Sequence, residues 1–369
     1  MEALDGRILV TGGAGFIGSA LVWALNGRGR RNILVCDVIG GSRKGRNLAP
    51  LRYADYVEGP VLRSRLAKNP AAFGKFSAVF HLGACSSTTE GNATYLIDNN
   101  TAFTRELAEW ALGRGTRFVY ASSAATYGDG SRGMDDKDPA LERLRPLNLY
   151  GYSKHLFDLD ARSRGWLGRI AGLKYFNVFG PNEEYKGEMR SVVSKAHEQI
   201  RKSGRLSLFR SHDPGYPDGG QMRDFLYVKD AVEMTLFFAE KGSKANGLYN
   251  LGSGQANTWL TLAGDIFGAL GRETKVEFIE MPEALRAKYQ YYTRADISKL
   301  RAAGYNRPIT PLADAVADYV TNYLVPDRPL GVQPKRPATR ARVQFRAARM
   351  AALEQAEASP PPLSHRPAS

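Results

Sequence analysis

Short apolar runs alternate with amphipathic stretches along most of the chain. Continuous apolar runs are typical of strands buried on both faces, and apolar residues that recur every three to four positions are typical of helices. Strands that alternate with helices favour a parallel sheet covered on both sides, so we expect an α/β fold with a doubly wound parallel sheet. The predicted strands of the first half span residues 7–10, 32–37, 78–82, 117–121 and 173–177.

The pattern changes near residue 177, where a second region begins, and sheet-like runs return near residue 225. We therefore expect a smaller, discontinuous α/β lobe that the chain enters twice. The proline-rich end of the chain carries few apolar residues and is expected to be disordered, with a short basic amphipathic helix at 340–356 as the alternative. The expected parts are 1–176 plus 224–252 for the sheet domain, 177–223 plus 253–325 for the smaller lobe and 326–369 for the tail.

The charge of the chain favours anionic partners. Lys and Arg number 51 against 37 Asp and Glu, a net charge of +14, and residues 326–369 contribute eight basic and three acidic residues to it. Contact of this tail with an anionic surface, either nucleic acid or membrane, is one hypothesis. No apolar run approaches the roughly 20 residues of a membrane span, and the acidic start of the chain argues against secretion.

The two cysteines, Cys36 and Cys85, are too few for a disulfide framework or a cysteine-rich zinc site. Both lie in apolar segments that are predicted to be buried strands or strand ends. We therefore expect a cytoplasmic protein without a bound metal.

The segment TGGAGFIG at 11–18 follows a predicted strand and opens a predicted helix, with Gly12, Gly15 and Gly18 at three-residue spacing. Glycines at these positions permit a tight turn and close approach of a diphosphate to the free N–H groups of a helix. Strand, spacing and helix together predict a Rossmann-type dinucleotide site rather than a simple glycine-rich turn.

Two features near the second strand bear on the choice of cofactor. Asp37 ends that strand, where a carboxylate can accept a hydrogen bond from the adenosine ribose, which favours NAD. Arg43, Lys44 and Arg46 follow within nine residues, and a cation there could hold the 2′-phosphate of NADP. A solvated basic loop would give the same pattern, so both cofactors stay open at this point.

Tyr150 and Lys154 lie four residues apart, one turn on the same face of a predicted helix. The ammonium could then lie near the phenol and favour its ionised form, because a phenol with a pKa near 10 is a poor base at neutral pH. Ser123, at the end of a predicted strand, could hold the reacting oxygen by a hydrogen bond. The Tyr–Lys spacing alone is weak, but its combination with the glycine turn and the serine points to catalysis.

Several segments together resemble the extended short-chain dehydrogenase/reductase family, and within it the branch of ADP-heptose 6-epimerases. The resemblance extends from about residue 7 to residue 323. The segments GACSSTTE and SSAATYG are much narrower markers than the glycine turn that the whole family shares. The matching segments are residues 83–90, 98–100, 120–128, 150–154, 175–181 and 300–305.

The resemblance implies inversion of C6 of the heptose in ADP-D-glycero-manno-heptose through a transient 6-keto form, with tightly bound NADP and with NAD as the alternative. It further implies a role in supplying heptose for the lipopolysaccharide core and assembly as a homo-oligomer, which the family suggests is a pentamer. A C6 hydroxyl has no acidifying neighbour, so oxidation and return of hydride to the opposite face account for inversion better than proton abstraction does.

The resemblance also assigns roles to residues. Tyr150 and Lys186 would be the two acid/base groups, Lys154 would orient the nicotinamide ribose and Ser123 would hold the reacting oxygen. The remaining cofactor residues would be Gly12, Gly15, Phe16, Ile17, Gly18, Asp37, Val38, Lys44, Leu82, Gly83, Ala84, Cys85, Ser86, Asn99 and Val178, with contributions from Tyr150, Lys154 and Lys186. The substrate residues would be Ser123, Asn177, Glu188, Lys195, Phe209, Arg223 and Tyr289.

Glu188 and Lys195 depart from the family pattern, since some relatives have a serine and a histidine there, and residues 211–221 form a longer loop. Three other functions compete with the favoured one. A 4,6-dehydratase is disfavoured because residues 124–126 lack an Asp-Glu pair. A UDP-sugar 4-epimerase is disfavoured mainly by GACSSTTE and Lys186, and a non-catalytic dinucleotide-binding subunit with a basic tail would not need Ser123, Tyr150 and Lys154 together.

Overall fold

The computed structural model describes residues 4–240, 245–286 and 289–333. The chain divides into two units, residues 1–331 and residues 332–369, and the architecture below is that of the first. The prediction for the tail falls almost wholly on residues 334–369, which lie outside the described residues.

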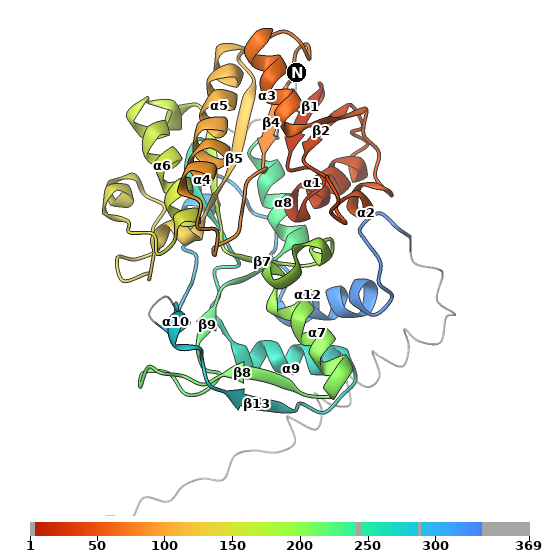
Figure 1. The fold of residues 1–369 in the computed structure, drawn as a ribbon, viewed down its shortest axis with the longest axis vertical. Coiled ribbons are helices and arrows are strands. Elements are labelled where there is room, and N and C mark those ends of the chain that lie inside the picture. The colour runs from red at the N-terminus through yellow and green to blue at the C-terminus, as the bar shows by residue number, and fades with distance from the viewer. Residues whose placement is uncertain (1–3, 241–244, 287–288, 334–369) are drawn as a thin grey trace, which may run out of the picture. The chain divides into compact units, whose positions relative to one another are not determined.

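Seven parallel strands form the central sheet in the order β11-β6-β5-β4-β1-β2-β3, which confirms the predicted doubly wound α/β fold (Figure 1). The chain runs outward from β1 through β2 to β3 and then returns to β4 on the other side of β1. The carboxyl ends of β1 and β4 therefore form the point where strand order reverses, the usual ligand site of such sheets. The strands are β1 (Ile8–Thr11), β2 (Ile33–Asp37), β3 (Asp55–Glu58), β4 (Ala78–His81), β5 (Arg117–Ser123), β6 (Ala171–Tyr175) and β11 (Gly247–Leu251).

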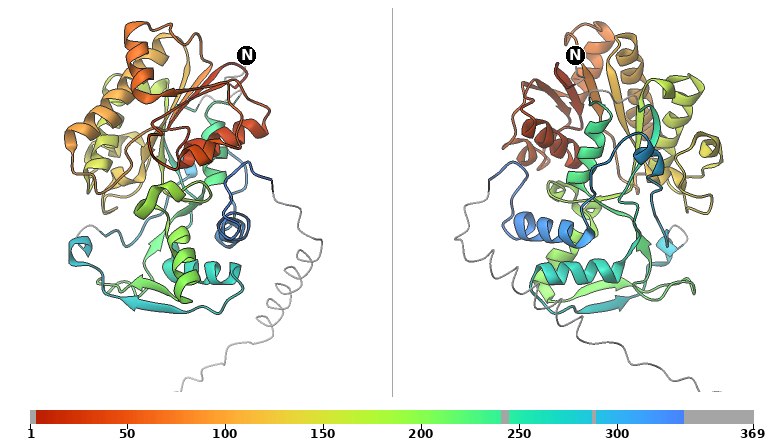
Figure 2. Two further views of the ribbon diagram at one scale, coloured as in Figure 1. Left: turned by 45° about the vertical axis from the view of Figure 1, so that its right-hand side comes forward. Right: turned by 180° about the vertical axis from the view of Figure 1, so that it is seen from behind.

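Helices cover both faces of this sheet because successive strand residues point to opposite sides. Val10 packs in one apolar cluster with residues of α1 and α8, whereas its neighbour Leu9 packs in a second cluster with residues of α3, α5 and α6. Figure 2 shows the two layers from two further sides. The helices are α1 (Phe16–Gly27), α8 (Val228–Phe237), α3 (Gly59–Lys68), α5 (Phe103–Gly113) and α6 (Leu149–Ser163), with short α2 (Gly45–Leu48), α4 (Ala93–Leu96) and a π-helical turn at Ile97–Ala102.

Three pairs of short strands and several helices make up the rest of the unit, below the sheet in Figure 1. The sheet cluster that contains Val10 continues into them through Val193 and Ile266, so one apolar core supports both parts. The pairs are β7 (Asn177–Phe179) with β10 (Phe225–Tyr227), β9 (Met222–Arg223) with β12 (Asn257–Thr258), and β8 (Leu206–Phe209) with β13 (Val276–Ile279). The helices are α7 (Val192–Ser203), α9 (Trp259–Ala269), α10 (Glu283–Arg286), α11 (Ser298–Ala302) and α12 (Leu312–Tyr319) with a π-helical end at Val320–Leu324.

The first residues of the expected tail belong to this unit. Leu330 is fully buried, and its backbone N–H donates to Asn182 Oδ1 at 2.9 Å. Arg46 donates to Asp327 Oδ1 at 2.9 Å. The sequence expectation missed these contacts because one buried leucine between prolines gives no periodic signal.

Candidate active site

The glycine turn between β1 and α1 has the backbone that close approach of a ligand requires. Gly12 has φ +66°, and a Cβ on it would lie 2.6 Å from the backbone nitrogen of Gly83. A Cβ on Gly18 would lie 2.0 Å from the Gly12 carbonyl oxygen. No side chain fits at either position, so the turn brings the N-terminus of α1 against the carboxyl end of β4, as a diphosphate site needs.

Asp37 is buried at the end of β2 and organises the neighbouring backbone. Its Oδ2 accepts the Ala14 N–H at 2.9 Å, and its Oδ1 accepts the Lys44 ammonium at 2.9 Å. Arg46 pairs instead with Asp327, away from the turn. Among the three basic residues of this loop, Lys44 is the one that lines the same cleft as Asp37. The residues present thus fit the adenosine end of a dinucleotide.

Ser123, Tyr150 and Lys154 lie together on the carboxyl end of β5 and the first turns of α6, and we call them the catalytic platform. The helix begins at Leu149 because the Asn148 side chain accepts the Gly151 N–H at 2.8 Å. Two of its residues, four apart, therefore face the strand end that carries Ser123.

The shifts in the pKa values of Tyr150 and Lys154 have causes other than their mutual attraction. Burial raises the pKa of Tyr150, and a hydrogen bond with Ser123 opposes that rise. Burial also lowers the pKa of Lys154 to about 8, and its ammonium donates to the Ala121 carbonyl at 2.8 Å. Removal of both groups from water therefore outweighs any attraction between them. The group that assists ionisation of the Tyr150 phenol is Ser123.

A buried ion pair links the elements that carry the catalytic platform. Asp158 and Lys174, 0% and 1% exposed, are 2.8 Å apart. Asp158 also accepts hydrogen bonds from the hydroxyls of Tyr120 at 2.8 Å and Ser122 at 2.7 Å. Because these groups belong to β5, β6 and α6, their contacts join β6 to the two elements, β5 and α6, that carry Ser123, Tyr150 and Lys154.

Lys186 is carried by a different kind of structure, the segment 183–190, which contains the 3-10 helix Glu184–Met189 and which we call the catalytic loop. Its ammonium lies 5.4 Å from the centre of the Phe16 ring. Burial lowers its pKa, and the nearby Glu183 carboxylate opposes that shift. A lysine in this position can give up or accept a proton more readily than an exposed one.

The fully buried Glu183 carboxylate anchors the catalytic loop. It accepts the backbone N–H of Ser191 at 2.5 Å, the Ser191 hydroxyl at 2.6 Å and the Tyr319 hydroxyl at 3.0 Å. Burial raises the pKa of Glu183, and the two Ser191 hydrogen bonds oppose the rise. The loop is thereby tied to the start of α7 and to α12.

Tyr185 joins the catalytic loop to the glycine turn. Its hydroxyl accepts the backbone N–H of Phe16 at 3.0 Å, and its ring lies 5.5 Å from the Lys44 ammonium. Burial raises the pKa of Tyr185 to about 12, so the phenol is protonated at neutral pH. Sequence reasoning missed this residue, since adjacency to Lys186 was the only available signal.

These elements enclose a cleft of about 310 Å³. It brings together the catalytic platform, Lys186 and most of the predicted cofactor residues, and it adds Tyr175 and Phe176, to which the sequence had given no role in the site. The predicted residues that line it are Gly12, Gly15, Phe16, Ile17, Gly18, Asp37, Lys44, Leu82, Gly83, Ala84, Ser86, Ser123, Tyr150, Lys154, Asn177, Val178 and Lys186. Those that do not are Val38, Cys85, Asn99, Glu188, Lys195, Phe209, Arg223 and Tyr289.

Four of the five substrate candidates outside the cleft form two groups, and the fifth, Phe209, ends β8. Lys195 donates to the Glu188 carbonyl at 3.2 Å beside the catalytic loop. Arg223 is 6% exposed, and its guanidinium lies 5.1 Å from the Tyr289 ring and 5.6 Å from the Trp259 ring. Burial lowers the pKa of Arg223. A buried guanidinium between two rings, with no carboxylate partner among the described residues, is suited to an anionic group.

Asp224, which sequence reasoning passed over, fixes the backbone next to Arg223. Its carboxylate accepts the backbone N–H groups of Ser253, Gly254 and Ala295 at 2.6–2.9 Å. These bonds oppose the rise in the pKa of Asp224 that its burial causes. The Asp224 carboxylate is thus used by backbone N–H groups, and it fixes the backbone that carries Arg223.

Within the part of the chain that the structure describes, no three His, Cys, Asp or Glu side chains are grouped so that they could hold a metal ion. None of the helices in residues 4–240, 245–286 and 289–333 is long and apolar enough to cross a bilayer. Cys36 is buried in β2 and Cys85 is half-buried after β4, and both are free thiols.

The glycine turn, the platform and the sheet define a nucleotide-dependent enzyme of the epimerase and dehydratase type: the chain belongs to the NAD dependent epimerase/dehydratase family, whose model matches residues 8–252. Over 316 residues it is 50% identical to the ADP-L-glycero-D-manno-heptose-6-epimerase of Nitratidesulfovibrio vulgaris (strain DP4), and the match covers 86% of this chain and 97% of that relative.

Two solved structures show the same fold. The Helicobacter pylori ADP-L-glycero-D-manno-heptose-6-epimerase is 26% identical with a TM-score of 0.71, over 87% of this chain and 97% of that one. The Thermus thermophilus UDP-glucose 4-epimerase, solved in complex with NAD, is 26% identical with a TM-score of 0.65, over 85% and 97%. The family and the shape of the cleft together support a nicotinamide dinucleotide as cofactor.

Proposed function

We propose that this chain inverts C6 of the heptose in ADP-D-glycero-manno-heptose to give the L-glycero form. The observation that carries the proposal is the meeting of Tyr150, on the catalytic platform, and Lys186, on the catalytic loop, in one dinucleotide-type cleft. An inversion needs an acid/base group for each orientation of the same hydroxyl, and these two groups come from separate elements. The 50% identity to an enzyme with this name supports the choice of substrate.

A bound nicotinamide dinucleotide would supply reversible hydride transfer, which is the chemistry that a C6 hydroxyl without an acidifying neighbour requires. The chain's own residues handle the proton and the orientation. Tyr150 takes the hydroxyl proton in one orientation, and its hydrogen bond with Ser123 favours the ionised phenol that this step needs. Lys186, with its lowered pKa, exchanges the proton in the other orientation.

In this proposal Lys154 orients the cofactor and does not transfer a proton. Its ammonium donates to the Ala121 carbonyl and lines the cleft, where it would orient the ribose of the nicotinamide. Lys44, which pairs with Asp37, is the cation that would hold a 2′-phosphate, and its presence in the cleft supports NADP over NAD. Arg223 is the candidate for the diphosphate of the ADP-sugar, because it is buried between rings without a carboxylate partner in the described residues.

The proposed role of the product is heptose supply for the lipopolysaccharide core, in the cytoplasm, where free thiols such as Cys36 and Cys85 persist. Homo-oligomeric assembly and the division into two lobes remain predictions from the sequence.

One experiment tests this function against the other sugar specificity of the family. Purified protein is denatured, the released dinucleotide is identified, and the native enzyme is assayed with ADP-D-glycero-manno-heptose beside UDP-galactose. We expect the released dinucleotide to be NADP, and we expect the native enzyme to interconvert the two C6 epimers of the ADP-heptose. Turnover of the UDP-sugar alone would overturn the proposed substrate.

A further inference from the structure

A second cavity, of about 640 Å³, lies on the other side of the catalytic loop from the dinucleotide cleft. Its walls come from α2, α7, the end of α12 and the segment 325–329. Apart from Arg43 and Arg46, which the sequence offered beside Lys44 for a 2′-phosphate, no residue with a predicted role in cofactor binding, substrate binding or catalysis lines it, and Tyr185 is shared with the cleft. The volume falls in the range of small-molecule sites, roughly 300–1,000 Å³.

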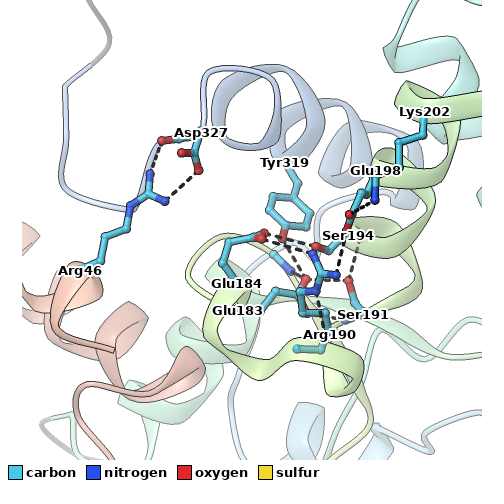
Figure 3. A network of polar contacts seen from close by, with 12 residues as sticks. Arg46, Glu183, Glu184, Arg190, Ser191, Ser194, Glu198, Lys202, Tyr319 and Asp327 are labelled. Atoms are coloured by element: carbon cyan, nitrogen blue, oxygen red, sulfur yellow. Dashed lines mark hydrogen bonds and ion pairs between the residues drawn. The ribbon is translucent and has the colours of Figure 1, made fainter. Parts of the chain in front are cut away.

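The lining of this second cavity is strongly basic. Six arginines line it against three carboxylates, those of Glu184, Glu198 and Asp327. All three carboxylates are already used by cations: Arg190 pairs with Glu184 and Glu198, and Arg46 pairs with Asp327 (Figure 3). The other four arginines have no carboxylate partner among the described residues, and these are Arg43, Arg201, Arg272 and Arg328.

Arg43, Arg201 and Arg272 are exposed at the rim of this cavity, and Arg328 is half-buried. Burial lowers the pKa of His197, which also lines the cavity; the positive charges of Arg201 and Arg272 lower it further, and the carboxylates of Glu184 and Glu198 oppose the shift. The Nε of Arg328 is buried with no hydrogen-bond partner in the described part of the chain, an arrangement that is costly in a folded protein unless a ligand or water completes it.

The other walls are aromatic and apolar. The buried Tyr319 and the half-buried Tyr323 line the cavity, and the Arg328 guanidinium lies 5.7 Å from the Tyr323 ring. Planar guanidinium groups bind phosphate oxygens in pairs of hydrogen bonds, and rings beside them can accept the organic part of a ligand.

We propose that this second cavity binds a small diphosphate. Four arginines that pair with no described carboxylate match the charge of a diphosphate better than that of a single carboxylate, and the pocket is large enough for an organic group attached to it. A ligand that contacts Arg190 competes with Glu184 of the catalytic loop, two residues from Lys186, so the site lies against the back of the proposed catalytic machinery. The site itself stands on the cavity and its arginines, whether or not the proposed reaction is right.

The test uses inorganic pyrophosphate as the probe and the cofactor-loaded enzyme, by calorimetry at low ionic strength. Arg223→Gln is introduced first, because Arg223 is the other candidate diphosphate site. We expect this variant to bind pyrophosphate, and the added pair Arg201→Gln and Arg272→Gln to weaken binding at least ten-fold. In a chain that keeps Arg223, the double substitution Arg201→Gln and Arg272→Gln should leave turnover and the mass of the assembled enzyme unaltered.

Two results would overturn the proposal. One is the absence of pyrophosphate binding to the Arg223→Gln enzyme. The other is equal binding with and without Arg201 and Arg272, including the case in which their loss changes only the assembled mass, since that would make them interface residues. Neither result bears on the C6 assay, so failure of this site and failure of the proposed function are separable.

Discussion

The catalytic platform and the catalytic loop hold the two proposed acid/base groups, Tyr150 and Lys186, in contrasting ways. Tyr150 lies on a helix that packs against the sheet and is braced below by the buried Asp158–Lys174 pair. Lys186 lies on a 3-10 segment held by polar contacts, chiefly those of Glu183 with Ser191 and Tyr319. One group is thus set by the fold itself, and the other by a local network that could be altered without unfolding the sheet.

This contrast suggests a division of labour between a fixed and an adjustable base. The same platform residues can serve any sugar whose reacting hydroxyl reaches Tyr150, so they define the chemistry. The loop carries the proposed second base and also forms a wall of the second cavity, so a ligand in that cavity would act on the reaction through this loop.

The largest expected effect is that of Tyr150→Phe. Removal of the phenol hydroxyl deletes one of the two proton-transfer groups, and we expect turnover to fall about 10³-fold, within the range for general acid/base groups. Bound cofactor, measured by absorbance of the purified protein, should be retained. Tyr152→Phe, on the same helix but 48% exposed, is the matched control and should keep normal turnover. Equal activity of the two variants would remove Tyr150 from the mechanism.

Lys186→Met should reduce turnover about 10²-fold or more while the melting temperature stays within a few degrees, because the loop is anchored by Glu183 rather than by the lysine. The measurement pairs initial rates with thermal unfolding. Lys275→Met, at an exposed lysine, is the control. Unchanged turnover in Lys186→Met would remove Lys186 from the mechanism and leave Tyr150 as the single proposed acid/base group.

Asp158→Asn tests the brace of the platform. The change leaves Lys174 as a buried charge without its partner, and we expect the free energy of unfolding to fall by about 3 kcal/mol. Urea unfolding measures it. Asp160→Asn, on the same helix with partly exposed partners, should cost less than about 1 kcal/mol. Similar losses in both variants would show that the buried pair has no special role.

From the lowered pKa of Lys154 we expect a smaller effect, a dependence of the free energy of unfolding on pH. Its pKa is about 8 in the folded chain against 10.5 ordinarily, so between these values the unfolded chain holds a proton that the folded chain has lost. The free energy of unfolding should therefore rise with pH across this window, by at most about 1.4 kcal/mol per unit from this group. Urea unfolding at pH 8 and 9.5 should show a steeper rise in the parent than in Lys154→Met. Identical slopes would contradict the lowered pKa of Lys154 in the folded chain.

The sequence predicted the sheet, the glycine turn and the platform because each is local. Apolar runs define strands, and the four-residue spacing of Tyr150 and Lys154 places both on one helix face. Lys186 carried no spacing signal and was assigned only by resemblance to a family. Tyr185, Glu183 and the second cavity depend on contacts between distant segments, such as Tyr185 with Phe16, which no periodicity records.

The central claim is that C6 is inverted by transient oxidation between two acid/base groups. The most direct measurement is NMR of ADP-D-glycero-manno-heptose incubated with the cofactor-loaded enzyme in D₂O. The account predicts a mixture of both C6 epimers in which C6 keeps its original hydrogen, since that hydrogen leaves and returns without meeting solvent. Deuterium at C6 of the product, or no second epimer at all, would contradict it.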